Sequence, residues 1–82
     1  MVRFYFHIQM REKILPDLDG IELPDIATAT DEALLTLREM LADAIRTGNK
    51  NMPDRLIITD SVGRELAVVS LADALPKALR PR

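Results

Sequence analysis

One long amphipathic stretch, from Ile26 to about Thr47, constrains the fold more than any other part of the sequence. With an advance of about 100° per residue, its apolar side chains fall in one arc of roughly 140°. Asp25 is a suitable N-cap, with Thr28 and Thr30 as alternatives, and Gly48 can close the helix. The stretch therefore predicts a helix of about 33 Å that crosses the domain, with the centre of its arc buried. The arc consists of Ile26, Ala33, Leu34, Leu37, Met40, Leu41, Ala44 and Ile45.

One apolar residue departs from this arc. Leu35 falls in the middle of the polar face, with Ala42 two turns further along. A lone exposed leucine needs no functional explanation. The alternative interpretation is a small contact patch for a second chain, so Leu35 is retained as a candidate interface residue.

Three further segments have the pattern of strands. Val2–Met10 alternates apolar and polar residues, and Arg55–Asp60 and Arg64–Ser70 are short apolar runs joined by a turn that contains Gly63. Between the first strand and the helix, Lys13–Leu23 holds two short apolar pieces around an Asp-Gly turn, which predicts an irregular hairpin or an extended crossing. Gly20 and Gly63 are both predicted to have positive φ, and we expect alanine to be more damaging at Gly63.

The length of 82 residues leaves room for one domain. We predict an α+β domain over residues 1–75: an antiparallel sheet of three to four strands with the long helix packed on one face, in the order β-(ββ)-α-β-β. Residues 76–82, which contain two prolines and three cations, are predicted to form a poorly ordered basic tail.

The last two predicted strands are apolar on both sides, which indicates that both sides are covered. One helix covers only one face of a sheet, and the segment that follows is small. An uncovered apolar face predicts an interaction site, and a two-fold dimer is the commonest solution. Alternate positions assign Ile57, Ala67 and Val69 to the uncovered face, opposite Leu56, Ile58, Leu66 and Val68.

The inventory of reactive side chains argues against an enzyme. His7 is the only histidine, the chain has no cysteine, and no independent triad can be assembled around either Ser61 or Ser70. We therefore predict no catalytic residue. His7 and its neighbour Tyr5 are interpreted as solvated or as part of the dimer contact, which would then weaken as His7 gains charge below about pH 6.5.

Metal, nucleic acid and membrane are each disfavoured as partners. A calcium loop opening at Asp17 would need glycine and glutamate where the sequence has Glu22 and Thr28, so we predict no metal and no cofactor. The net charge of −2 and the interspersed signs do not favour nucleic-acid binding. No apolar run reaches the roughly 20 residues that span a bilayer. The absence of cysteine fits a cytoplasmic protein.

Two stretches resemble a family of short bacterial proteins of unknown function. They are Arg3–His7, and Pro16–Asp25 leading into a helix rich in alanine and leucine. The segment Ala72–Leu75 also fits this family, so the resemblance covers the chain from Arg3 to Leu75. That family has no established activity, so the resemblance implies a fold and no mechanism.

A looser resemblance, from Phe4 to Ile45, is to the HicB-type antitoxin domain, a partial ribonuclease-H-like sheet with one helix. It rests on Pro16-Asp17-Leu18 and Gly20 ahead of the helix. Such antitoxins continue into a DNA-binding segment, and residues 76–82 are too few for one. The sequence thus predicts a non-catalytic, homodimeric protein-interaction module. The alternatives are an antitoxin-like inhibitor of a small ribonuclease and a nucleic-acid binder.

Overall fold

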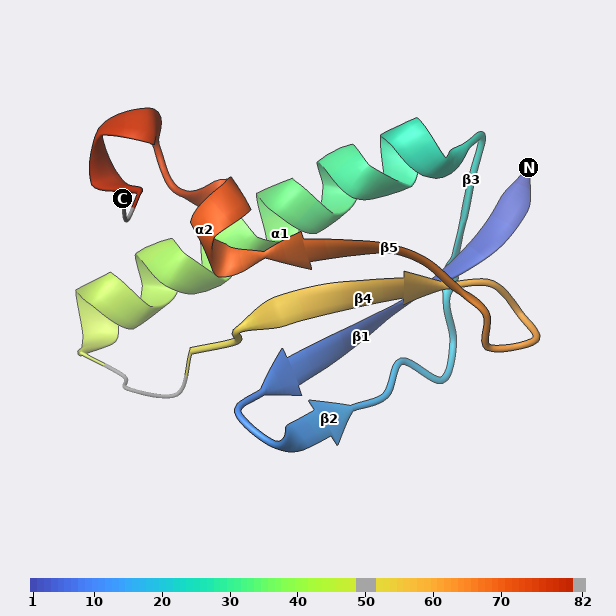
Figure 1. Ribbon diagram of the computed structural model, residues 1–82, viewed down its shortest axis with the longest axis horizontal. Coiled ribbons are helices and arrows are strands. Elements are labelled where there is room, and N and C mark those ends of the chain that lie inside the picture. Colours follow the sequence, from blue (N-terminus) through green and yellow to red (C-terminus); the bar gives the residue numbers. More distant parts are fainter. Residues whose placement is uncertain (49–51, 81–82) are drawn as a thin grey trace.

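The computed structural model describes residues 1–48 and 52–80, and residues 49–51 and 81–82 lie outside this description. The described chain forms an antiparallel sheet with one long helix against it (Figure 1). This confirms the predicted α+β class and order of elements, with five strands in place of three to four. The elements are β1 (Val2–Met10), β2 (Lys13–Leu15), β3 (Ile21–Leu23), α1 (Ile26–Thr47), β4 (Arg55–Thr59), β5 (Glu65–Ser70), α2 (Leu71–Ala74) and the 3-10 helix η1 (Lys77–Leu79).

The strand β1 is the centre of the sheet. The strand order is β2-β1-β4-β5, and β3 also pairs with β1. β2 pairs with the end of β1 at Ile8–Met10, and β3 pairs with its beginning at Val2–Phe4. The two short strands therefore follow one another along β1. Of the two arrangements predicted for Lys13–Leu23, the extended crossing is the one observed.

The helix α1 has the bounds and caps that the sequence predicts. It begins at Ile26, where the Asp25 carboxylate accepts a hydrogen bond of 2.8 Å from the backbone N–H of Thr28. It ends after Thr47, where Gly48 has a φ of 71° in the left-handed region. Both ends are thus set by local chemistry, because the carboxylate satisfies a first-turn amide and glycine carries no Cβ to strain the closing turn.

The helix packs on the sheet mainly through small side chains. Its buried residues are Ala29, Ala33, Leu37 and Ala44. Because alanine projects only a methyl group, the helix backbone lies close to the strands, and Leu37 supplies the one large buried side chain of α1. The core opposite and beside the helix consists of Phe4, Leu56, Ile58, Val69 and Ala74.

The buried face of α1 is narrower than the predicted arc and is turned to one side of it. Ile26 and Ile45 are 40% and 74% exposed. Leu37 and Leu41 lie near the centre of the arc, and both are predicted to be buried, but only Leu37 is buried and Leu41 is half-buried. Ala29, outside that arc, is fully buried. The difference arises because α2 packs beside the C-terminal half of α1, so Leu41 and Ile45 face a groove instead of the core.

The register of β4 and β5 corrects the predicted division of their faces. Leu56 lies opposite Val69, and Ile58 lies opposite Ala67. Residues directly opposite in an antiparallel pair share a face of the sheet. All four therefore face α1, with Val69 only 3% exposed. The prediction that Ala67 and Val69 belong to the uncovered face is wrong.

A β-bulge explains the error. The register shifts between Ile58 and Thr59, so that Leu66 is an extra residue on β5. One extra residue exchanges the two faces for every residue beyond it. As a result Leu66 and Val68, predicted to lie under the helix, lie on the opposite face together with Ile57.

The C-terminal segments lie on the same side of the sheet as α1. Ser70 and Asp73 form a capping box at the start of α2, and Ala74 is buried in the core below α1. η1 falls inside the segment 76–82, which the sequence predicts as a poorly ordered tail, and residues 81–82 of that tail lie outside the described residues. Among the described residues, no helical element covers the second face of the sheet.

Candidate functional site

The face of the sheet opposite α1, here called the open face, is the first candidate site. Ile57 on β4 lies between His7 on β1 and Val68 on β5, so the three form a row across the sheet. Val68 is 41% exposed and Leu66 is 44% exposed. Ile14 of β2 is 51% exposed and lies opposite Gln9 of β1, so Gln9 and His7 separate it from Ile57 on this face.

The structure brings together three of the six residues predicted for an interface. Tyr5, His7 and Ile57 share the open face by their register. Ala67 and Val69 are on the α1 side, as corrected above, and Leu35 is 50% exposed on the helix, away from the open face. Sequence reasoning missed Leu66 and Val68, and only the position of the bulge could have revealed them.

His7 is held on both sides by hydrogen bonds. Its Nδ1 accepts a bond of 3.0 Å from the backbone N–H of Asp17, and its Nε2 lies 2.9 Å from the hydroxyl of Thr59. A backbone amide can only donate, so Nδ1 of the neutral ring must carry the lone pair. Nε2 then carries the hydrogen and donates to Thr59, which is 7% exposed.

This arrangement differs from a catalytic pair of histidine and hydroxyl. A general base must accept the proton of the hydroxyl that it activates. The ring nitrogen that faces Thr59 instead donates to it, and the opposite nitrogen meets an amide where a triad has a carboxylate. In this geometry the two hydrogen bonds of His7 connect the loop at Asp17 with β1 and β4.

Asp17 organises the loop that follows β2. Its carboxylate accepts hydrogen bonds from the backbone N–H groups of Phe6, Asp19 and Gly20 at 3.1, 3.2 and 3.1 Å. Burial raises the pKa of this carboxyl, but the three amide donors and nearby His7 lower it more, so its pKa lies below the usual value. The side chain also bonds to β1 at Phe6, between the positions where β2 and β3 pair.

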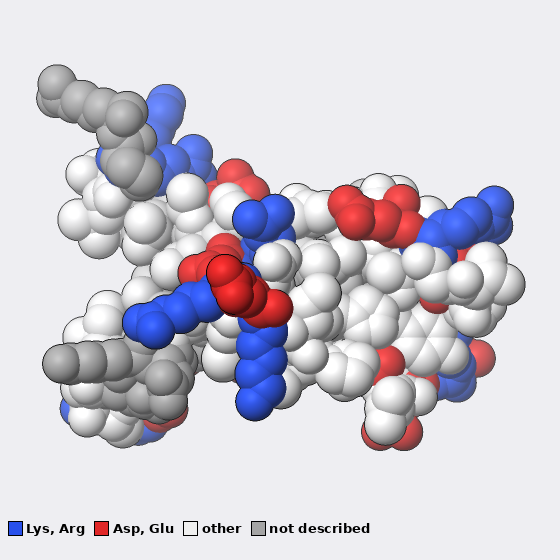
Figure 2. Space-filling view, turned by 60° about the horizontal axis from the view of Figure 1, so that its bottom comes forward, with Lys and Arg blue, Asp and Glu red and all other residues white. Residues whose placement is uncertain are grey.

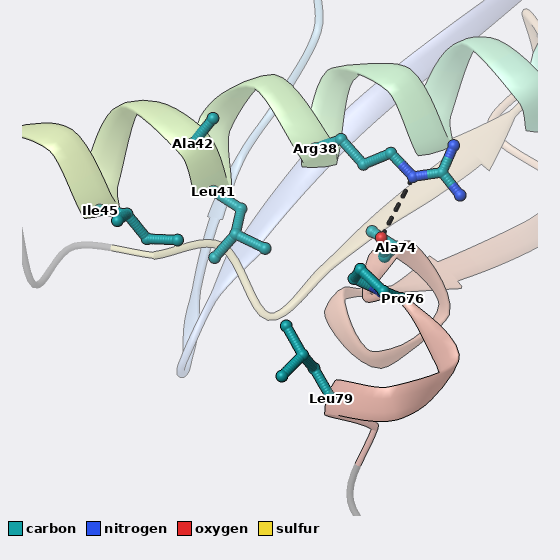
Figure 3. Close-up of a pocket in the computed structure, with 7 residues that line it drawn as sticks. All are labelled: Arg38, Leu41, Ala42, Ile45, Ala74, Pro76 and Leu79. Carbon is teal, nitrogen blue, oxygen red and sulfur yellow. Dashed lines mark hydrogen bonds between the residues drawn. The ribbon is translucent and has the colours of Figure 1, made fainter.

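The second candidate site is an apolar groove of about 420 Å³ between the C-terminal half of α1 and the α2–η1 segment (Figure 3). Among the described residues that line it, Arg38 is the only charged one, and its Nε donates a hydrogen bond of 3.1 Å to the backbone oxygen of Ala74. Sequence reasoning missed this groove, although Ile45 sits at the margin of the predicted arc. The walls are formed by Arg38, Leu41, Ala42 and Ile45 on one side and by Ala74, Pro76 and Leu79 on the other.

Charged side chains of both signs are mixed over the surface shown in Figure 2, with uncharged areas between them. Arg3 and Glu22 form an exposed ion pair, with 3.4 Å between nitrogen and oxygen. Within residues 1–48 and 52–80, no group of three His, Cys, Asp or Glu side chains is placed to hold a metal ion. No helix of the described chain is both long enough and apolar enough to cross a membrane.

The sequence of this chain matches a known class of domain. The chain is a member of the DUF6894 family, a domain of unknown function, whose sequence model matches residues 3–72. This confirms that Arg3–His7 and Pro16–Asp25 indicated a short domain family of unknown function. Searches among curated proteins and among solved structures found no match.

Proposed function

We propose that this protein is a non-catalytic interaction module that forms a two-fold homodimer through the open face of its sheet. The observation that carries the proposal is the row of Ile57 and Val68, with Leu66 beside it, on a face that no described helix covers. A contiguous exposed apolar patch on a small protein marks a surface where another molecule packs.

The edge of the sheet beside this face supports a second copy as the partner. β5 is the last strand in the sheet order, and no described strand pairs with its outer side. Edge strands are commonly protected from pairing by lysine, proline or inward-pointing charges. The residues Leu66–Val69 carry none of these. A two-fold axis that packs the two open faces against each other, with the β5 edges at the rim of the contact, would bury the apolar patch of both copies.

Sedimentation equilibrium from low to high micromolar concentration tests the proposal. We expect the unchanged chain to dimerise in this range. Val68→Glu places a charge in the centre of the patch and is expected to give a monomer. The matched control is Val62→Glu, because Val62 is 75% exposed in the turn between β4 and β5 and lies off the patch.

Circular dichroism of both variants separates loss of assembly from loss of fold. The proposal requires Val68→Glu to keep the spectrum of the folded chain while the weight-average mass falls to that of the monomer. If the unchanged chain is monomeric at every concentration, or if Val62→Glu disrupts assembly as strongly as Val68→Glu, the open face is not the dimer interface.

A further inference from the structure

The two ends of the groove between α1 and the α2–η1 segment differ in chemical character. Arg38, Ala42 and Ile45 are spaced by four and three residues, so they lie along one side of α1. From Arg38 to Ile45 the helix rises about 10 Å. Figure 3 shows the guanidinium beside Ala74 at one end of the groove and the side chain of Ile45 toward the other. The groove is therefore charged at one end and apolar along the rest.

Arg38 has hydrogen-bonding capacity left at the charged end. Its Nε is occupied by the backbone oxygen of Ala74, which holds the side chain against α2. Within the described chain, neither of its two terminal nitrogens has a hydrogen-bond or ion-pair partner. A guanidinium held in this way presents a planar pair of donors that matches a carboxylate or a phosphate oxygen pair.

The size of the groove selects the class of ligand. A volume of about 420 Å³ is in the range of small-molecule sites, which run from about 300 to 1,000 Å³. A helix with its side chains is about 10–12 Å across and needs anchors over more than two turns, which is longer than the apolar run from Leu41 to Ile45. A single extended chain fits this length.

We propose that the groove binds a small amphipathic anion, with its anionic head at Arg38 and an unbranched apolar tail along Leu41, Ala42 and Ile45 against Pro76 and Leu79. This site is separate from the open face, since its lining comes from α1, α2 and η1.

Isothermal titration with decanoate, below its micelle concentration, tests the proposal directly. Decanol and decyltrimethylammonium have the same tail with a neutral and a cationic head. We expect saturable binding of decanoate with one site per chain, weaker binding of decanol, and the weakest binding of the cation. Amide shifts in nitrogen–proton correlation spectra should concentrate at Leu41, Ile45 and Ala74.

Two variants separate the head site from the tail site. Arg38→Ala is expected to weaken decanoate binding by about three- to fivefold, because the ion pair is exposed to solvent, and to leave decanol binding unchanged. Ala42→Trp fills the groove and is expected to abolish binding of both. Thr36→Trp, on another side of the same helix, is the control that keeps wild-type binding.

Three results would overturn the proposal. The first is the absence of saturable decanoate binding to the folded chain. The second is equal affinity for the three head groups, which would show a nonspecific apolar surface. The third is loss of self-association in Ala42→Trp with no effect on decanoate, which would assign the groove to a second copy of the chain.

Discussion

The backbone N–H of Asp17 donates a hydrogen bond of 3.0 Å to Nδ1 of His7, and so a loop residue sets the tautomer of a strand residue. The opposite nitrogen of the same ring lies 2.9 Å from the Thr59 hydroxyl on β4. The loop after β2, the strand β1 and the strand β4 therefore meet at one imidazole on the open face.

The neutral ring of His7 is expected to be the Nε2–H tautomer, because its Nδ1 is occupied as an acceptor. Long-range nitrogen–proton NMR of the ring distinguishes the two tautomers. Thr59→Val removes only the partner of Nε2, so the tautomer should persist in that variant. A proton found on Nδ1 would contradict the hydrogen-bond arrangement described here.

Asp17→Asn should destabilise the fold by about 1–3 kcal/mol, since three backbone donors lose a charged acceptor. Urea unfolding at neutral pH measures this change. Asp19→Asn is the control, because among the described residues the Asp19 carboxylate accepts no hydrogen bond. If Asp17→Asn lowers the free energy of unfolding no more than this control does, the carboxylate of Asp17 does not stabilise the loop.

The lowered pKa of the Asp17 carboxyl predicts that the stability of the fold decreases as the pH falls. Its pKa in the folded chain is lowered, so folding is favoured by its ionised form. That contribution is fully present above the unfolded pKa of about 3.9 and is lost as the pH falls through the lower folded pKa. Between pH 5 and pH 2.5 we therefore expect Asp17→Asn to lose less stability than the unchanged chain, measured by urea midpoints. Parallel curves would contradict this assignment.

Alanine should be more damaging at Gly20 than at Gly63, the reverse of the ranking expected from the turn sequences. Both have positive φ, 70° and 86°. A Cβ at Gly20 would lie 2.9 Å from the backbone oxygen of Phe4, whereas one at Gly63 has nothing within 4 Å. We expect a loss of about 1–2 kcal/mol at Gly63 from the backbone alone, and about 2–5 kcal/mol at Gly20. Thermal unfolding of the two variants decides the order.

Leu37→Ala should lower the free energy of unfolding by about 2–5 kcal/mol, because Leu37 is fully buried. Leu41→Ala should cost clearly less, since Leu41 is half-buried and lines the groove. Denaturant unfolding of both variants measures the difference. Equal losses would place Leu41 in the core and contradict the groove as a surface feature.

The bounds of α1 could be predicted because its signals are local. Asp25 and Gly48 act within one turn of the helix, and the apolar period lies within the stretch itself. Which side of the helix is buried depends on a segment that lies far from α1 in the sequence. The α2–η1 segment covers one flank of α1, and nothing in the sequence of α1 itself indicates that cover.

The sequence predicts that one face of the sheet lacks a covering helix, but it does not predict all of the residues on that face. Counting alternate positions assumes an unbroken ladder, and the bulge at Thr59 breaks it. A one-residue shift exchanges the two faces of the strand. Ala67 and Val69 therefore lie under the helix, and Val68 lies on the open face, which is the reverse of the prediction. Tyr5, His7 and Ile57 were placed correctly because the β1–β4 ladder has no such shift.

The central position of β1 has a consequence for the order in which the chain can fold. β1 pairs locally with β2 and β3, but its other edge pairs with β4, where contacting residues such as His7 and Thr59 are 52 positions apart. During synthesis, β1 leaves the ribosome well before β4 does. An apolar strand with a free edge is then exposed until the second half of the chain arrives. The closing of the β1–β4 ladder, with its long loop, is the step expected to limit the folding rate.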